Sequence, residues 1–385
     1  MDVRDKLDIL SRDAQYDLSC ACGTKNRDEH RFRRDDNSWV YPVTVANGGS
    51  GIILKTLLSN MCTSDCRYCP LRENSDTRRI SISPDEIARF FINFISHRPL
   101  IGIFLSSGII KDADYTMDRL VAVGRLLRYR YKYKGYIHIK IIPGASEAAI
   151  DSALAVSSAV SLNIEAPGEK HFNLLSSKKR YQTDIIDSLK YISRRIQEDR
   201  KLRRIHTTSQ FIVGASNESD KEILNYTFGM YKRLDMGRLY FSAYQAGLGE
   251  PSLPGEIRKR EKESEPFRLS GDLVDSSLLN REHRLYQADY LFRQYRFSYD
   301  DLIFDAEGNL DLREDPKTVW ADNHPEFFPV SVKKGKKEEL LRVPGIGPVM
   351  ANRIIRLRRE TPLSDLSQLY LPRHLYNKAG SYLTI

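Results

Sequence analysis

Short apolar segments alternate with longer amphipathic ones between residues 51 and 243. The apolar segments are typical of buried strands and comprise residues 52–58, 99–105, 136–142, 159–165, 206–213 and 238–243. The segments between them predict helices over 84–96, 114–131, 146–156, 182–203 and 220–233, the first opened by Ser83, Pro84 and Glu86 as a capping pattern. Strands that alternate with helices form a parallel sheet. The pattern therefore predicts an α/β fold with a partial (β/α)6 TIM-like barrel.

The rest of the chain departs from this pattern and predicts further regions. Residues 1–45 are polar and turn-rich and are interpreted as an N-terminal extension to a core barrel over 46–250. Residues 251–330 are interpreted as a linker and helical extension: glycines and prolines predict a loop over 246–280, and a helix is expected over 281–296. Residues 331–385 predict a small all-α domain.

Charge is concentrated in this last region. The chain carries 60 Lys and Arg against 51 Asp and Glu, a net charge of +9. Residues 331–385 hold eleven of the basic residues and four of the acidic ones, a local balance of +7. Such a basic domain suggests a polyanionic partner, although solubility is the alternative explanation. No apolar window approaches a membrane span and the N-terminus has no apolar signal segment, so we expect a cytoplasmic protein without a membrane partner.

The five cysteines form two clusters. Cys62, Cys66 and Cys69 have the spacing C-x3-C-x2-C directly after the first predicted strand, whereas Cys20 and Cys22 lie in the extension. Three thiolates on one loop suit a [4Fe–4S] cluster, whose fourth iron then stays open to another ligand. A zinc knuckle completed by Cys20 or Cys22, or three ordinary buried cysteines, are the alternatives.

Polar residues mark the ends of several predicted strands, where barrel enzymes place their sites. Ser106, Ser107 and Gly108 follow the second strand, Lys140 lies in the third, and Asn163 and Glu165 alternate with apolar residues in the fourth. Gln210 belongs to the fifth strand, with Thr208, and Tyr240, Ser242 and Tyr244 mark the sixth. A plain turn, an outward-facing lysine and a polar network inside the barrel are the structural alternatives.

The C-terminal region contains a helix-hairpin-helix pattern, Glu338 to Ile355, built around Pro344-Gly345-Ile346-Gly347. The glycines permit a tight turn, and backbone N–H groups at the start of the next helix can hold phosphate. We expect Leu341, Ile346, Ala351 and Ile354 to pack the two helices. The predicted nucleic-acid-binding residues are Gly345, Ile346, Gly347, Val349, Arg353 and Arg356. A protein-interaction or purely structural unit is the alternative.

The cysteine motif, with Tyr68 before its third cysteine, resembles the radical S-adenosylmethionine (SAM) superfamily. Nearly the whole chain resembles the radical SAM family assigned to DNA modification or repair, through Tyr16 to Cys20, Phe104 to Gly108, Gly135 to Lys140, Arg281 to Asp289 and the terminal hairpin. The resemblance implies that Cys62, Cys66 and Cys69 hold a [4Fe–4S] cluster. It implies that SAM is bound by Tyr68, Ser106, Ser107, Gly108, Lys140, Asn163, Glu165 and Gln210. Ser106 to Gly108 replace the Gly-Gly-Glu turn usual in this superfamily.

In this superfamily one electron from the reduced cluster splits SAM, and the 5′-deoxyadenosyl radical takes a hydrogen from the substrate. The resemblance implies DNA as the substrate, an electron donor such as ferredoxin or flavodoxin, and a uracil-DNA-glycosylase-like protein as a possible partner. An RNA-modifying enzyme and a non-catalytic DNA-binding scaffold are the competing hypotheses. No catalytic residue beyond the cofactor sites is identifiable from the sequence.

Overall fold

The computed structural model describes residues 1–16, 40–44, 49–264 and 276–385. It divides into two compact units, and each is described by itself. Unit 1 comprises Met1–Glu218 and Gly229–Leu279, and unit 2 comprises Ser219–Phe228 and Asn280–Ile385. Cys20 and Cys22 lie outside the described residues, so the structure does not test their predicted roles.

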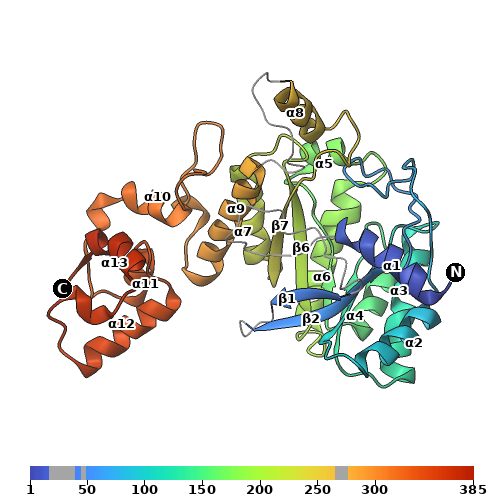
Figure 1. Ribbon diagram of the computed structural model, residues 1–385, viewed down its shortest axis with the longest axis horizontal. Coiled ribbons are helices and arrows are strands. Elements are labelled where there is room, and N and C mark those ends of the chain that lie inside the picture. The colour runs from blue at the N-terminus through green and yellow to red at the C-terminus, as the bar shows by residue number, and fades with distance from the viewer. Residues whose placement is uncertain (17–39, 45–48, 265–275) are drawn as a thin grey trace. The chain divides into compact units, whose positions relative to one another are not determined.

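A curled seven-stranded sheet forms the frame of unit 1 (Figure 1). Its strands are β1 (Val40–Thr44), β2 (Ser50–Leu57), β3 (Gly102–Ser106), β4 (Tyr136–Lys140), β5 (Ala159–Ser161), β6 (His206–Val213) and β7 (Arg238–Ala243). Strands β2 to β7 are parallel and follow the order of the chain, and β1 pairs antiparallel with β2. Because β1 and β7 are the two edges, the barrel stays open. The predicted α/β fold with a partial barrel is confirmed.

Helices connect these strands as the sequence pattern predicts. Unit 1 contains α1 (Val3–Asp13), α2 (Pro84–Ile95), α3 (Ala113–Arg125), α4 (Glu147–Val156), α5 (Glu169–Leu175), α6 (Asp187–Glu198) and α8 (Pro254–Glu263), and α7 (Asp220–Leu234) and α9 (Ser276–Gln294) have residues in both units. Helical turns over Leu126–Arg130 and Tyr181–Ile186 extend α3 and precede α6. The capping pattern of α2 is confirmed, since the side chains of Ser83 and Glu86 each accept the other's backbone N–H.

Alternation along the strands separates a core face from a polar face. Phe211 of β6 and Phe241 of β7 are almost completely buried, and their rings stack with centroids 6.0 Å apart. Ile103 and Leu105 of β3 are fully buried as well. Because successive side chains point to opposite faces, the residues next to them, such as Ser106 and Gln210, face the interior of the half-barrel.

Several elements differ from the sequence-based expectations, among them the following. The strand expected over 159–165 ends at Ser161, because Glu165 has a left-handed backbone (φ 63°) that an extended strand cannot contain. Helix α1 and strand β1 lie within the region expected to be a turn-rich extension. Helix α8 lies in the expected loop 246–280; Pro254 occupies its first turn, but its very polar sequence gives no apolar periodicity.

Unit 2 contains the C-terminal helices. They are α10 (Pro316–Asp322), α11 (Lys337–Arg342), α12 (Pro348–Glu360) and α13 (Arg373–Ala379), with short turns at Tyr299–Asp301, Pro325–Phe327, Leu366–Leu369 and Gly380–Tyr382. A two-stranded parallel sheet joins β8 (Val330–Ser331) to β9 (Leu383–Thr384). Leu341, Ile346, Ala351 and Ile354 belong to the core between these elements, as predicted. No helix in the described part of the chain is long and apolar enough to cross a membrane.

Replacing Phe211 tests the outer core of the sheet. Phe211→Ala removes a fully buried ring and leaves a cavity beside Phe241, so we expect the free energy of unfolding to fall by roughly 3–5 kcal/mol. Tyr129, whose side chain is 60% exposed, is the control, and Tyr129→Ala should change it by less than about 0.5 kcal/mol. Chemical denaturation followed by circular dichroism measures both. Equal effects would contradict the assignment of Phe211 to the core.

Candidate functional site

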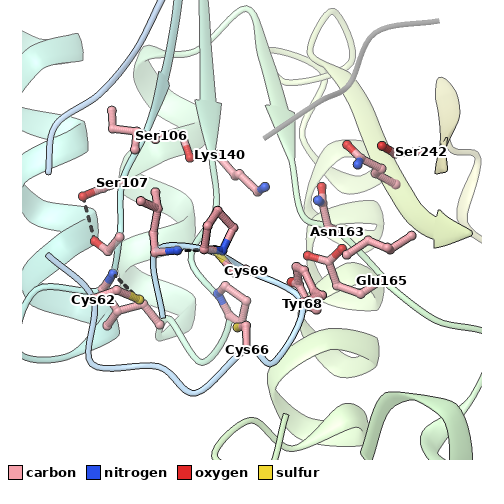
Figure 2. Close-up of a pocket in the computed structure, with 18 of the residues that line it drawn as sticks. Cys62, Cys66, Tyr68, Cys69, Ser106, Ser107, Lys140, Asn163, Glu165 and Ser242 are labelled. Carbon is pink, nitrogen blue, oxygen red and sulfur yellow. Dashed lines mark hydrogen bonds between the residues drawn. The ribbon is translucent and has the colours of Figure 1, made fainter. Parts of the chain in front are cut away.

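One pocket opens at the carboxyl ends of the parallel strands of unit 1 (Figure 2). The loop after β2 contributes Cys62, Cys66, Tyr68 and Cys69 to its lining. The ends of the strands and the segments after them contribute Ser106, Ser107, Gly108, Lys140, Asn163, Glu165, Gln210, Ser242 and Tyr244. The structure therefore brings all eight predicted SAM-binding residues and all three motif cysteines to one cavity.

Backbone and side-chain donors surround the three sulfur atoms. Cys62 Sγ accepts from the backbone N–H groups of Ser64 at 3.4 Å and Ile109 at 3.5 Å, and Cys69 Sγ accepts from that of Leu71 at 3.4 Å. Cys66 Sγ lies 2.9 Å from Lys179 Nζ and 3.2 Å from Ser64 Oγ. Hydrogen bonds to the ligand sulfurs are among the factors that set the reduction potential of an iron–sulfur cluster.

Burial and a neighbouring cysteine oppose ionisation of Cys69. Burial and, after it, the charge of the nearby Cys66 together raise the pKa of Cys69 to about 12, although the hydrogen bond from the backbone N–H of Leu71 lowers it. Lys179 counteracts this repulsion: burial alone would lower its pKa, but the charge of Cys66 and the hydrogen bond to it outweigh burial and raise the pKa of Lys179. Cys69 would therefore have to lose a proton to hold iron, and Lys179 would supply positive charge beside the thiolates.

Glu165 occupies a strained position on the opposite wall. Its backbone is left-handed at φ 63°, which is uncommon for a residue with a long side chain and is often found at functional sites. Two backbone bonds to β6 hold it, from Glu165 N to Gln210 O at 2.9 Å and from Ile212 N to Glu165 O at 2.8 Å. Its side chain accepts a hydrogen bond from Tyr68. Burial, followed by the charge of Glu165, raises the pKa of Tyr68. The cysteine loop and the segment after β5 thus meet in the pocket.

Gln210 and Gly108 show what the pocket can accept. Gln210 is buried on β6, and its Oε1 has no hydrogen-bond partner among the described residues, so it can accept from a bound molecule.

A Cβ on Gly108 would lie 2.3 Å from the carbonyl oxygen of Met61 and 3.1 Å from Cys62 Cβ. Only glycine lets the turn after β3 approach the cysteine loop this closely.

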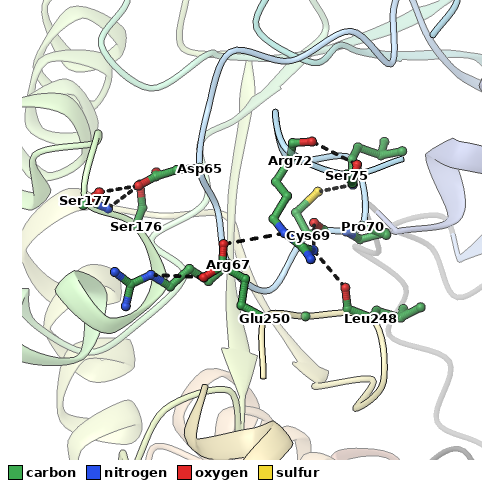
Figure 3. A network of polar contacts seen from close by, with 12 residues as sticks. Asp65, Arg67, Cys69, Pro70, Arg72, Ser75, Ser176, Ser177, Leu248 and Glu250 are labelled. Atoms are coloured by element: carbon green, nitrogen blue, oxygen red, sulfur yellow. Dashed lines mark hydrogen bonds and ion pairs between the residues drawn. The ribbon is translucent and has the colours of Figure 1, made fainter. Parts of the chain in front are cut away.

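Asp65 anchors the cysteine loop to the segment after α5 (Figure 3). Its carboxylate accepts hydrogen bonds from both hydroxyls of Ser176 and Ser177 at 2.5 Å and from the backbone N–H groups of Ser177 at 2.8 Å and Lys178 at 3.4 Å. Burial alone would raise the pKa of Asp65, but these bonds outweigh it and lower the pKa to about 2. The carboxylate therefore stays ionised at neutral pH and holds Lys179, three residues further on than Ser176, beside Cys66.

A second set of contacts joins the cysteine loop to the loop after β7 (Figure 3). Arg72 Nη1 donates to the carbonyl oxygens of Cys69 and Leu248, both at 3.0 Å. Glu250 lies 3.7 Å from the guanidinium groups of Arg67 and Arg72, and its N–H donates to the Arg67 carbonyl at 2.8 Å. The loop that carries the cysteines is thus fixed both to the segment after α5 and to the loop after β7.

The sequence-based search missed Asp65 and Lys179. Asp65 lies inside the cysteine motif, between Ser64 and Cys66, and its acidic side chain was the available signal. Lys179 lies 113 residues after Cys66 in a run of lysines that resembles any solvated loop, so no local pattern marks it. Among the weaker predictions, Ser242 and Tyr244 line the pocket, and the Tyr244 hydroxyl donates to Glu256 of α8 at 2.5 Å.

The predicted hairpin of unit 2 is a tight turn between α11 and α12. Gly345 has a left-handed backbone (φ 81°), and Gly347 is the N-cap of α12 without a side-chain capping bond. Ile346 is fully buried, its N–H donates to Val343 O at 3.1 Å, and its carbonyl accepts from Lys317 Nζ at 2.6 Å. Ile346 therefore supports the turn from inside, whereas Val349 and Arg356 are exposed at the surface.

Comparison with known proteins identifies the class. Residues 56–227 match the family described as "Radical SAM superfamily". These residues form a radical SAM domain. Enzymes of this class use a [4Fe–4S] cluster and SAM. No curated protein sequence matches the chain.

The solved structures that are similar to it include the following three. HydG, a maturase of the [FeFe]-hydrogenase, is 12% identical over 62% of this chain and 49% of its own, with a TM-score of 0.43. Methylornithine synthase (PylB) is 14% identical over 62% of this chain and 63% of its own, also with a TM-score of 0.43. HydG from Carboxydothermus hydrogenoformans is 13% identical over 85% and 76%, with a TM-score of 0.42. The chain spans less than two thirds of the first two.

The residues present fit both cofactors. No group of three or more His, Cys, Asp or Glu side chains in the described part of the chain is placed to hold a single metal ion. A [4Fe–4S] cluster instead takes each thiolate on a different iron. The buried Oε1 of Gln210 and the charge of Lys179 supply polar contacts for a ligand beside it.

Removal of the Asp65 carboxylate tests the loop anchor. We expect Asp65→Ala to weaken cluster binding roughly 10–100-fold, since residues that hold metal ligands have effects of this size. Asp76 is exposed in the same loop and makes no hydrogen bond or ion pair with the described residues, so Asp76→Ala is the matched control. Iron and sulfide per chain after anaerobic reconstitution, and their loss to a chelator, measure the effect. Equal retention in both variants would contradict the anchoring role.

Proposed function

We propose that this protein is a radical SAM enzyme that modifies or repairs nucleic acid, with DNA as the preferred substrate. The observation that carries the proposal is the combination of a cysteine pocket in unit 1 with a basic hairpin in unit 2. Residues 331–385 carry a local charge of +7, and their turn places Gly345 and Gly347 at the start of α12. Helix N-termini of this kind bind phosphate, and phosphate contacts position a nucleic acid without selecting its sequence.

In the mechanism, Cys62, Cys66 and Cys69 would hold the cluster. When bound, the reduced cluster supplies one electron that splits SAM and so generates a radical able to abstract hydrogen from the substrate. Lys179 would balance the carboxylate of SAM or the negative charge of the thiolates, and Gln210 Oε1 would accept a hydrogen bond from an amino or hydroxyl group. Glu165, held in place by β6 and Tyr68, would accept from the ribose or the amino group.

The other pocket residues shape and close the site. Ser106, Ser107 and Gly108 would line the methionine end, and Asn163 and Lys140 would contact the remaining polar groups of SAM. A ferredoxin or flavodoxin is the proposed electron donor, as is common among radical SAM enzymes. A uracil-DNA-glycosylase-like protein stays a predicted partner. Gly345, Gly347, Val349, Arg353 and Arg356 are the proposed contacts to nucleic acid.

Loss of one cluster ligand separates the two activities. We expect Cys66→Ala to abolish reductive cleavage of SAM and to leave DNA binding unchanged, because the hairpin belongs to unit 2. The assay is anaerobic reconstitution, reduction with dithionite in the presence of SAM, and measurement of 5′-deoxyadenosine with and without duplex DNA. Cleavage by the variant at the wild-type rate would contradict the cluster assignment. Absence of cleavage by a wild-type protein with a full cluster would favour the scaffold hypothesis.

The salt dependence of binding tests the phosphate contacts. Arg356 is exposed on α12, and we expect Arg356→Ala to reduce the slope of log K against log[salt] by about 1 and to weaken binding to all sequences alike. Arg130→Ala, on the surface of unit 1, is the control and should leave the slope unchanged. Fluorescence anisotropy with duplex DNA and duplex RNA measures both the slope and the preference. Tighter binding of RNA would favour the RNA-modifying alternative.

A further inference from the structure

Tyr370 of unit 2 is held outward at the surface. Its side chain is 71% exposed, whereas tyrosine is typically a residue of intermediate burial. Its neighbour Leu369 is fully buried, and Leu371 packs against the same core. Because both neighbours are fixed inside, the backbone between them directs the ring of Tyr370 into solvent.

The backbone of Tyr370 is strained as well. It has φ 50° and ψ 45°, the left-handed region that bulky residues rarely adopt. Hydrogen bonds hold the turn Leu366–Leu369 before it in place. The Asp365 side chain accepts from Ser367 N at 2.7 Å, and Tyr370 N donates to Ser367 O at 3.0 Å. A strained residue that the surrounding structure holds in place is a reason to look for a function.

A cation and an apolar side chain accompany the exposed ring. The guanidinium of Arg353 lies 5.9 Å from the ring centroid of Tyr370, a distance at which a cation and an aromatic ring attract each other. Val349 lies one turn earlier on α12, on the same side of the helix as Arg353, and is 84% exposed. Val349 lies two residues after Gly347, so an apolar contact point, a cation and an aromatic face occur together beside the proposed phosphate contacts.

We propose that Tyr370, Arg353 and Val349 form a stacking surface for unpaired bases of a nucleic acid whose backbone the hairpin holds. Every base has a π-face that stacks on tyrosine and on arginine, whatever its sequence, whereas a base inside a duplex has both faces covered. The surface therefore selects single strands, gaps and bulges over continuous duplex. The inference rests on the proposed function of the hairpin and adds to it the class of nucleic acid bound.

Binding of three oligonucleotides by the full chain tests the inference. The probes are a fluorescein-labelled single strand of about 20 nucleotides, the corresponding duplex, and a duplex with a short single-stranded gap. We expect Tyr370→Ala to weaken binding of the single strand and the gapped duplex about tenfold, and to leave continuous duplex within about twofold. Tyr370→Phe keeps the aromatic face and should retain wild-type affinity. Tyr376→Ala is the matched control, since Tyr376 is 40% exposed on α13 of the same unit.

A second variant reports stacking directly. Tyr370→Trp adds one indole to the two tryptophans of the chain, and its emission should be quenched by the single strand and not by continuous duplex. An equal loss of duplex and single-strand binding in Tyr370→Ala, or an unquenched indole in a bound complex, would overturn the stacking surface. If the wild-type chain binds none of the three probes, the hairpin does not hold nucleic acid, and the proposed function of unit 2 fails with it.

Discussion

Burial of negative charge is the constraint on which the candidate site depends. The three thiols must lose their protons to bind iron, yet burial and mutual repulsion raise the pKa of Cys69 to about 12. Two kinds of donor offset the cost of negative charge on the sulfurs. Backbone N–H groups donate to Cys62 and Cys69, and the ammonium of Lys179 lies 2.9 Å from Cys66. Asp65 then serves the site indirectly, because its ionised carboxylate fixes the segment that carries Lys179.

The pocket is formed where strand β5 ends early and the chain after it becomes irregular. A longer strand would have satisfied the backbone after Ser161 by ladder bonds alone. Instead Ile164 N donates to the side chain of Ser209 at 3.0 Å, and Glu165 turns into the left-handed region. Two backbone bonds to β6 hold it there, so the strain is balanced by the neighbouring strand and the carboxylate reaches Tyr68.

Much of the frame could be predicted from sequence, because buried parallel strands are continuous apolar runs and the helices between them carry caps such as Ser83. The cysteine loop was recognisable for a similar reason, since its ligands are close together in the chain. Strand β1 was missed because it includes Pro42 and has a polar surrounding sequence. Lys179 was missed because its partner is 113 residues away, and the left-handed backbones of Glu165 and Tyr370 depend on tertiary packing that no local pattern records.

Unit 1 contains a buried polar pocket, and unit 2 carries an exposed aromatic and basic surface. Under the proposed function, both features bear on which substrate the protein can accept. The pocket of unit 1 is lined by buried polar side chains, so a reacting atom must enter it. A base inside a duplex cannot do so until it leaves the stack, at a cost that is smallest for a base already unpaired. Unit 2 would lower that cost if its exposed ring and guanidinium bind unpaired bases, since the nucleic acid would then arrive with its stacking already interrupted. The proposed recognition of unpaired bases by unit 2 and the proposed radical chemistry in the pocket of unit 1 therefore favour the same kind of substrate.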